Sequence, residues 1–190
     1  MKLIFLINTM SDYDTYSTLI NEALKRKYKI LCLHNYTLQI SRPYSFPYTN
    51  LNPFKKKTQT KKAIFKKNLY QILKKNDFDF IFSKRLPPLT QDQDKEYLKL
   101  IKGKFNLIMD GIDIYDVCKN IKLYKNLQIN IFLWSNFFKQ KLLKFLKEFY
   151  HSSFLSIKEK HFSLHVVGHM FSKLEKNKDE IKDKYRIPKN

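Results

Sequence analysis

Short apolar stretches rich in isoleucine, phenylalanine and valine recur along the chain. Their apolar residues follow one another instead of alternating with polar ones, a pattern typical of strands covered on both faces in a parallel sheet. The longer segments between them show a helical repeat. We therefore predict strands at residues 3–7, 29–33, 78–82, 105–109, 129–134 and 164–167.

The segments between the predicted strands place apolar residues on one side of a helix. In residues 61–75, for example, Phe65 and Leu69 share a face, while Lys67 points away from it. Alternation of strand and helix favours an α/β fold with right-handed crossovers, which here means a doubly wound, mostly parallel, Rossmann-like sheet of about six strands. The predicted helices are residues 14–27, 61–75, 91–102 and 136–150, with a long irregular segment at 41–60.

The chain of 190 residues carries a formal charge of +20, which ordinarily indicates a nucleic acid, an anionic membrane or an acidic substrate as partner. However, 33 of its 37 basic residues are lysine, and other residues with A/T-rich codons (Asn, Ile, Phe and Tyr) are also abundant. Genome composition is therefore expected to supply much of the charge. Arginine is the more usual reader of phosphate and guanine, and the lysines are scattered over every predicted helix. These features argue against nucleic acid, and a basic, non-enzymatic nucleic-acid-binding module is kept as the alternative function.

The two cysteines, Cys32 and Cys118, form neither a C-x-x-C pair nor part of a ligand cluster. Isolated thiols of this kind are typical of a reducing compartment. The apolar run at residues 3–7 is shorter than the core of a signal peptide, and no run approaches the length of a transmembrane helix. We expect a cytoplasmic protein, with peripheral binding at the inner face of the membrane as an additional hypothesis.

That hypothesis rests on residues 41–60 and the lysines that follow them. Aromatic residues, among them Phe54, precede residues 55–75, which contain nine lysines and no acid. The aromatic rings would enter the headgroup region while the lysines lie over anionic lipid. A solvated loop followed by an ordinary amphipathic helix explains the same pattern, so both interpretations stay open. The predicted membrane contacts are Tyr44, Phe46, Tyr48, Lys55, Lys56 and Lys57.

Ligands of open parallel sheets bind at the carboxyl ends of the strands, where helix N-termini converge. Residues 8–12, after the first predicted strand, contain neither G-x-G-x-x-G nor the Walker lysine, which disfavours dinucleotide and P-loop enzymes. Several polar residues at these ends, Ser11 and Ser135 among them, can equally be plain helix N-caps. The ligand-binding candidates at the strand ends are Asn8, Ser11, Lys84, Arg85, Trp134, Ser135 and Asn136.

Two carboxylates and one histidine are the candidate catalytic residues. Asp110 and Asp113 flank a glycine after a predicted strand, where a carboxylate can act as general base on a sugar or polyol hydroxyl, or simply form a turn. His169 follows the last predicted strand and is placed to face a cleft. We expect Asp110, Asp113 and His169 to lie with Ser135 along one cleft.

The histidine spacing does not favour a metal site. His161, His165 and His169 are four residues apart, which on a helix would suit a metal ion. Val166 and Val167 favour a strand, in which positions four apart are separated by ~13 Å. We therefore predict no metal site and no cofactor.

Residues 131–138, which read IFLWSNFF, suggest a strand followed by a helix that an aromatic and a small polar residue open. Residues 166–169 read VVGH and are followed by a charged stretch that ends in YRIPKN at residues 185–190. Together these segments resemble the end of the first domain of GT-B transferases, especially the CDP-glycerol glycerophosphotransferase-like and related surface-carbohydrate enzymes. The chain departs from the family at Met170 and Phe171, where Pro and Arg are usual, and at Asp110-Gly111, where His-Gly is frequent.

The resemblance implies a single GT-B half-domain on the acceptor side at residues 1–170, followed at residues 171–190 by the crossover helix and linker toward a second domain that is absent here. The expected function is to bind the acceptor of a glycosyl- or glycerophosphotransferase in surface polysaccharide or teichoic-acid-like polymer synthesis, without turnover by this half alone. The implied partners are a lipid-linked or polymer acceptor and, only with a second domain, a nucleotide-activated donor. The identities of donor and acceptor, and the stereochemical course, stay open.

Overall fold

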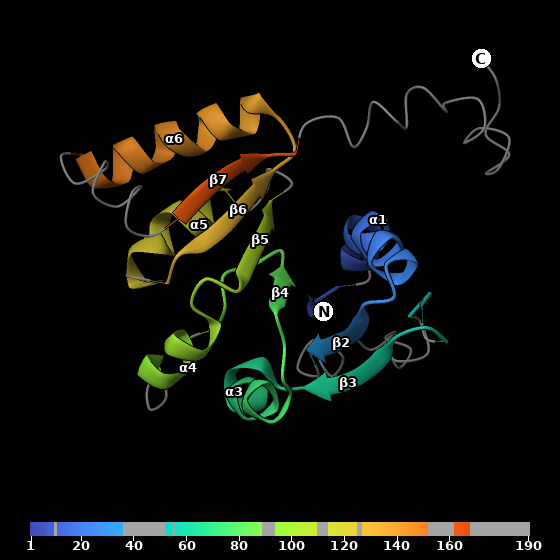
Figure 1. Cartoon of the computed structure of the whole chain (residues 1–190). Coiled ribbons are helices and arrows are strands. Elements are labelled where there is room, and N and C mark those ends of the chain that lie inside the picture. Colours follow the sequence, from blue (N-terminus) through green and yellow to red (C-terminus); the bar gives the residue numbers. More distant parts are fainter. Residues whose placement is uncertain are drawn as a thin grey trace, which may run out of the picture.

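The described part of the protein forms one sheet of seven parallel strands (Figure 1). The computed structural model describes residues 1–9, 11–35, 52–54, 56–88, 94–109, 114–124, 127–151 and 162–167. The strand order is β3-β2-β1-β4-β5-β6-β7, and all six neighbouring pairs are parallel. This confirms the predicted α/β, doubly wound, Rossmann-like fold. The strands are β1 (Lys2–Ile7), β2 (Lys29–Asn35), β3 (Gln59–Ala63), β4 (Phe80–Ser83), β5 (Phe105–Met109), β6 (Ile129–Leu133) and β7 (Phe162–Val166).

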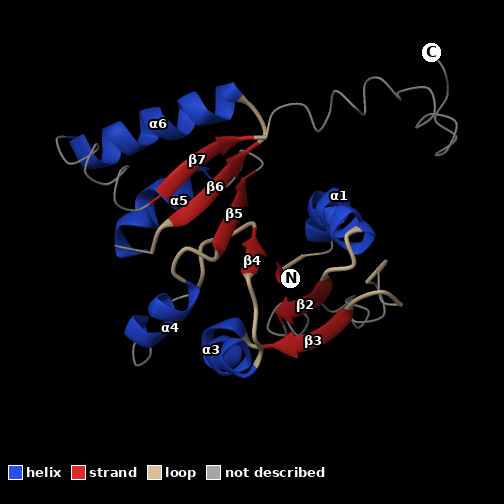
Figure 2. Ribbon diagram, in the orientation of Figure 1, coloured by secondary structure: helices blue, strands red, loops and turns tan. Residues whose placement is uncertain are grey.

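Helices cover both faces of this sheet (Figure 2). Helix α1 lies on one face and packs on β1 and β2, whereas the helices that follow β3, β4, β5 and β6 lie on the other face. The sheet is therefore the middle of three layers. The helices are α1 (Ser11–Lys25), α3 (Phe65–Lys75), α4 (Asp94–Ile101), α5 (Ile114–Asn120) and α6 (Asn136–Tyr150), with a 3-10 turn, η2, at Ile121–Tyr124.

Strand β1 shows why its sequence is continuously apolar. Successive side chains of a strand point to opposite faces. Phe5 belongs to the core under α1, and Ile4 and Leu6 belong to the larger core under the other helices. All three are at most 1% exposed. Both faces of β1 thus bury apolar surface, as predicted for a strand in the middle of a parallel sheet.

Strand β3 was not predicted, and the helix expected at residues 61–75 begins only at Phe65. Residues 59–63 instead pair in parallel with β2 at the edge of the sheet. An edge strand leaves one side free for solvent, so it tolerates polar residues. Accordingly, Lys61 and Lys62 are exposed and Ala63 is buried. The predicted irregular segment therefore ends before Gln59, and residues 168–190 lie outside the described part.

Candidate functional site

The strand order creates a switch point between β1 and β4. The chain leaves β1 through α1 on one face, and it leaves β4 toward α4 on the other. Connections that diverge in this way open a crevice at the carboxyl edge, which is where ligands of such sheets bind. A cleft of about 440 Å³ lies there, lined by residues that follow β1, β2, β3 and β4 and by η2.

Two short turns fix the polar floor of the cleft. Asn8, directly after β1, is 8% exposed and accepts a hydrogen bond through Oδ1 from Nδ2 of Asn35 at 3.2 Å. At the end of β4, the hydroxyl of Ser83 donates to the carbonyl of Arg85 at 2.7 Å and accepts from the Arg85 N–H at 3.1 Å. The backbone that carries the Arg85 guanidinium is therefore held by Ser83, which is itself buried.

The N-terminus of α3 faces the cleft with Phe65 and Lys66. No acidic residue stands in the first turn of this helix, and the side chain of its N-cap residue, Ile64, forms no capping bond. The N–H of Ile64 donates to Oδ1 of Asn68 at 2.8 Å. The early N–H groups of a helix have no acceptor within the helix and carry a partial positive charge. This end of α3 therefore favours an anion in the cleft.

The charges around the cleft have one sign. Lys66 and Arg85 are the charged residues among its described lining, and no acid is among them. Neither side chain forms an ion pair within the described ranges. A carboxylate, that of Asp116 on α5, lines an adjoining hollow of about 350 Å³ that shares Arg85 and Tyr124 with the cleft. Two cations and a helix N-terminus thus converge on one space.

Two prolines and a tyrosine form another part of the cleft wall. Pro87 and Pro88 line the cleft after β4. The buried hydroxyl of Tyr124, from η2, donates to the carbonyl of Pro87. Each proline fixes its own φ and the tyrosine anchors the loop, so both restrict the conformations of this wall. Neither η2 nor the role of Tyr124 was predicted, since a single tyrosine in a polar stretch indicates neither a 3-10 turn nor a hydrogen bond to a distant loop.

The turn after β1 is closed by its own carboxylate. Asp12 is 3% exposed, and its Oδ2 accepts from the N–H groups of Asn8 at 2.6 Å and of Thr9 at 3.0 Å. Its Oδ1 accepts from the Thr9 hydroxyl at 3.0 Å. In many Rossmann-like folds a phosphate occupies the equivalent place at the N-terminus of the first helix. Here Asp12 uses these N–H groups, which agrees with the lack of a phosphate-loop motif in residues 8–12.

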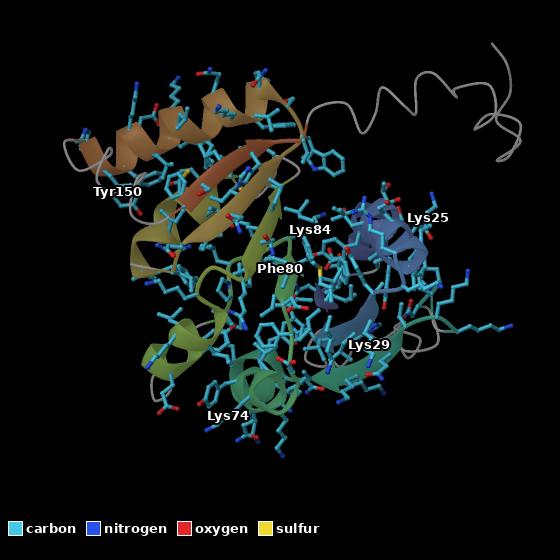
Figure 3. The ribbon with its side chains drawn as sticks, in the orientation of Figure 1. Lys25, Lys29, Lys74, Phe80, Lys84 and Tyr150 are labelled. Carbon is cyan, nitrogen blue, oxygen red and sulfur yellow. The ribbon has the colours of Figure 1, made fainter. Side chains whose placement is uncertain are left out.

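The predicted ligand-binding residues are not all at the cleft. Asn8 and Arg85 line it, whereas Lys84, labelled in Figure 3, is half-buried and is not in its lining. Ser11 begins α1, but its side chain lies outside the description.

The three predicted residues around α6 lie away from this cleft. Ser135 is the N-cap of α6, and its hydroxyl accepts from the Phe138 N–H at 3.4 Å. Asn136 is exposed in the first turn of that helix. Trp134 lines a separate apolar hollow of about 90 Å³ on the α1 side of the sheet.

Several predicted residues fall outside the described ranges: Asp110, Asp113, His169, Tyr44, Phe46, Tyr48 and Lys55. Lys56 and Lys57 are described and exposed. The half-buried ring of Phe54 packs against Tyr13, with centroids 6.4 Å apart, so it belongs to the α1-side core. None of the helices in the described part is long and apolar enough to cross a bilayer.

A buried polar cluster lies on the other side of β2 from the cleft. Oη of Tyr13 and Nε2 of His34 are hydrogen-bonded at 2.5 Å, and both side chains are almost fully buried. Burial, helped by the charge of Lys62, lowers the pKa of His34 to about 4. Burial also raises the pKa of Tyr13 far above its ordinary value and that of Cys32 to about 11. All three groups are therefore neutral at pH 7, which favours a structural role.

Comparisons of the chain with protein-family models, with curated proteins and with solved structures each found no match. The geometry and charge of the cleft are therefore the basis of the functional assignment.

Proposed function

We propose that this domain binds a phosphate-bearing ligand in the carboxyl-edge cleft, as the acceptor-binding half of a GT-B-like glycosyl- or glycerophosphotransferase in surface-polymer synthesis. The observation that carries the binding function is the convergence of Lys66, Arg85 and the N-terminus of α3 on a cleft without a described acid. The transferase context comes from the resemblance of residues 131–138 and 166–190 to that family. A seven-stranded parallel sheet is compatible with it, although a fold alone does not define a function.

Each element of the cleft has a separate task in this proposal. Arg85 forms paired hydrogen bonds to phosphate oxygens, because its guanidinium presents donors in a planar fork. Lys66 adds a point charge, and the N-terminus of α3, with its partial positive charge, completes the anion site. Asn8 offers its amide to a hydroxyl group of the ligand. The two prolines exclude water from one side of the bound group.

The donor half of the reaction requires groups that the described domain does not offer. Asp12 takes the N–H groups of the first turn after β1, where a nucleotide diphosphate commonly binds. In the proposed enzyme, a nucleotide-activated donor binds only when a second domain is present. The isolated chain therefore binds acceptor-like phosphates and does not bind CDP-glycerol with micromolar affinity.

Isothermal titration calorimetry with sn-glycerol 3-phosphate tests the binding function. A charge-assisted hydrogen bond contributes about 1.5–3 kcal/mol, so the double variant Lys66→Gln/Arg85→Gln should bind at least about tenfold more weakly than the wild type. The matched control is Lys67→Gln/Lys99→Gln, which removes two exposed lysines that do not line the cleft. This control should retain affinity within about twofold.

Two results would contradict the proposal. Equal weakening in both double variants would show that overall charge, and not the cleft, attracts the phosphate. Tight binding of CDP-glycerol by the wild-type chain would contradict the need for a second domain.

A further inference from the structure

A second basic hollow lies at the opposite, amino edge of the sheet. It has a volume of about 520 Å³, and four lysines from three segments line it: Lys2, Lys29, Lys56 and Lys57. We call this group the lysine hollow. Lys2 and Lys29 stand at the starts of β1 and β2, and Lys56 and Lys57 belong to the turn before β3. The label of Lys29 in Figure 3 marks its place on β2.

The register of the sheet brings two of these charges together. Lys2 is the direct partner of Lys29 in the β1–β2 pair. Like charges at directly opposed positions of neighbouring strands repel each other. The described lining contains no acid that could compensate them. One carboxylate, that of Asp79, accepts from the backbone N–H of Lys2 at 2.7 Å and is not part of the lining. An anion bound in the hollow would relieve this repulsion.

Hydrogen bonds fix the turn that carries the other two lysines. The buried Asn52 donates through Nδ2 to the hydroxyls of Thr58 and Thr60 at 3.1 and 2.9 Å and accepts from the Phe54 N–H at 2.8 Å. The Lys57 N–H donates to the Phe54 carbonyl at 2.8 Å. The turn thus holds Lys56 and Lys57 over the hollow before any ligand arrives.

We propose that the lysine hollow is a second anion site, which binds a group carrying clustered phosphates. Its concave shape and its four lining lysines suit a compact polyanion. Two sources share this chemistry: a soluble polyphosphate and the phosphate headgroups of an anionic membrane. The site is independent of the cleft, from which it is separated by the length of the strands, so either site can exist without the other.

Tripolyphosphate, titrated calorimetrically into the full chain at low salt, tests the site. Lys29→Gln/Lys56→Gln/Lys57→Gln should weaken binding to the hollow about tenfold or more. Each substitution removes one positive charge that attracts the phosphates, and this attraction is little screened at low salt. Two controls accompany it. Lys99→Gln/Lys102→Gln/Lys119→Gln removes the same charge from exposed sites elsewhere, and the cleft variant Lys66→Gln/Arg85→Gln tests independence. Because the proposed cleft also binds phosphate, the cleft variant should lose the binding event of the cleft. In both controls the tripolyphosphate site of the lysine hollow should keep its wild-type affinity within about threefold.

Stability and source are measured in parallel. The thermal midpoint of the triple hollow variant should equal or exceed that of the wild type, since Lys29→Gln removes the repulsion with Lys2. If the triple variant fails to fold, Lys56→Glu/Lys57→Glu in the exposed turn replaces it. Co-sedimentation with phosphatidylglycerol vesicles, compared with phosphatidylcholine vesicles, identifies the source. Binding to phosphatidylglycerol vesicles that needs the hollow lysines indicates lipid headgroups. Binding of tripolyphosphate without binding of these vesicles indicates a soluble ligand.

The proposal is overturned if the hollow variant and the charge control lose equal affinity. It is also overturned if the hollow variant binds tripolyphosphate as the wild type does, or if the wild type binds neither tripolyphosphate nor phosphatidylglycerol vesicles. Loss of the tripolyphosphate site in the cleft variant alone would place the phosphates in the cleft and would likewise refute a second site.

Discussion

Acidification should destabilise the protein through His34. The imidazole is 1% exposed and hydrogen-bonded to Tyr13, and its pKa is about 4 in the folded state against an ordinary value of 6.5. Between these two values the unfolded chain binds a proton that the folded protein does not bind. The contribution of the neutral His34 to the free energy of unfolding is therefore fully present above pH 6.5 and decreases as the pH falls toward 4. The difference of about 2.5 pKa units corresponds to about 3 kcal/mol.

That magnitude is a large share of the 5–15 kcal/mol that stabilises an ordinary domain. Urea denaturation between pH 7 and pH 4, followed by the fluorescence of Trp134, the single tryptophan, measures it directly. In the variant His34→Gln, the amide can still hydrogen-bond to Tyr13 but cannot take up a proton. We expect this variant to be about 1–2 kcal/mol less stable than the wild type at pH 7. Its loss of stability toward pH 4 should be smaller by about 3 kcal/mol.

The matched control is His165→Gln, which removes an exposed imidazole on β7 and so reports the cost of losing a histidine at the surface. If wild type and His34→Gln lose the same free energy of unfolding between pH 6.5 and pH 4, the reasoning is refuted. Such a result would mean that His34 is solvated or already charged in the folded protein.

Three further predictions concern the core, the thiols and a helix cap. Leu69→Ala should lower the free energy of unfolding by about 2–5 kcal/mol in a urea titration, since Leu69, on the buried face of α3, is 1% exposed. In the same titration Phe137→Ala, at a residue that is 68% exposed, should cost less than about 1 kcal/mol. Cys32 and Cys118 should react with a thiol reagent such as DTNB only after unfolding, because both are buried and burial raises their pKa to about 11 and about 12; rapid reaction of the native protein would contradict this. Ser135→Ala should cost at most about 1 kcal/mol by thermal denaturation, because its 3.4 Å capping bond is long.

The central strands of the fold could be predicted because both of their faces are buried, which requires apolar residues at successive positions. In β1 and β5 every buried position is apolar apart from Asn106, so continuous hydrophobicity identifies them. Strand β3 could not be found in this way. Its sequence, QTKKA, is stabilised by pairing with β2 and not by its own burial, and Lys61 and Lys62 resemble the start of the helix that follows.

The candidate site was predicted only in part, for a related reason. Position after a strand end identified Asn8 and Arg85, because the carboxyl edge of a parallel sheet is fixed by the strand pattern. Lys66 was not predicted as a site residue. The predicted helix began at residue 61, which places Lys66 in the second turn, whereas α3 begins at Phe65 and Lys66 lies in its first turn. The closure of the first turn by Asp12 depends on hydrogen bonds that cannot be predicted from residue spacing.

The most direct test of the proposed function is to locate phosphate on the chain by NMR. Backbone amide spectra of the full chain are recorded during titration with sn-glycerol 3-phosphate at constant pH and ionic strength. We expect saturable shifts that are largest at Phe65, Lys66 and Arg85. These shifts should disappear in Lys66→Gln/Arg85→Gln but not in Lys67→Gln/Lys99→Gln. Saturable shifts that avoid these residues, or the absence of saturation up to millimolar ligand, would contradict a phosphate site in the cleft.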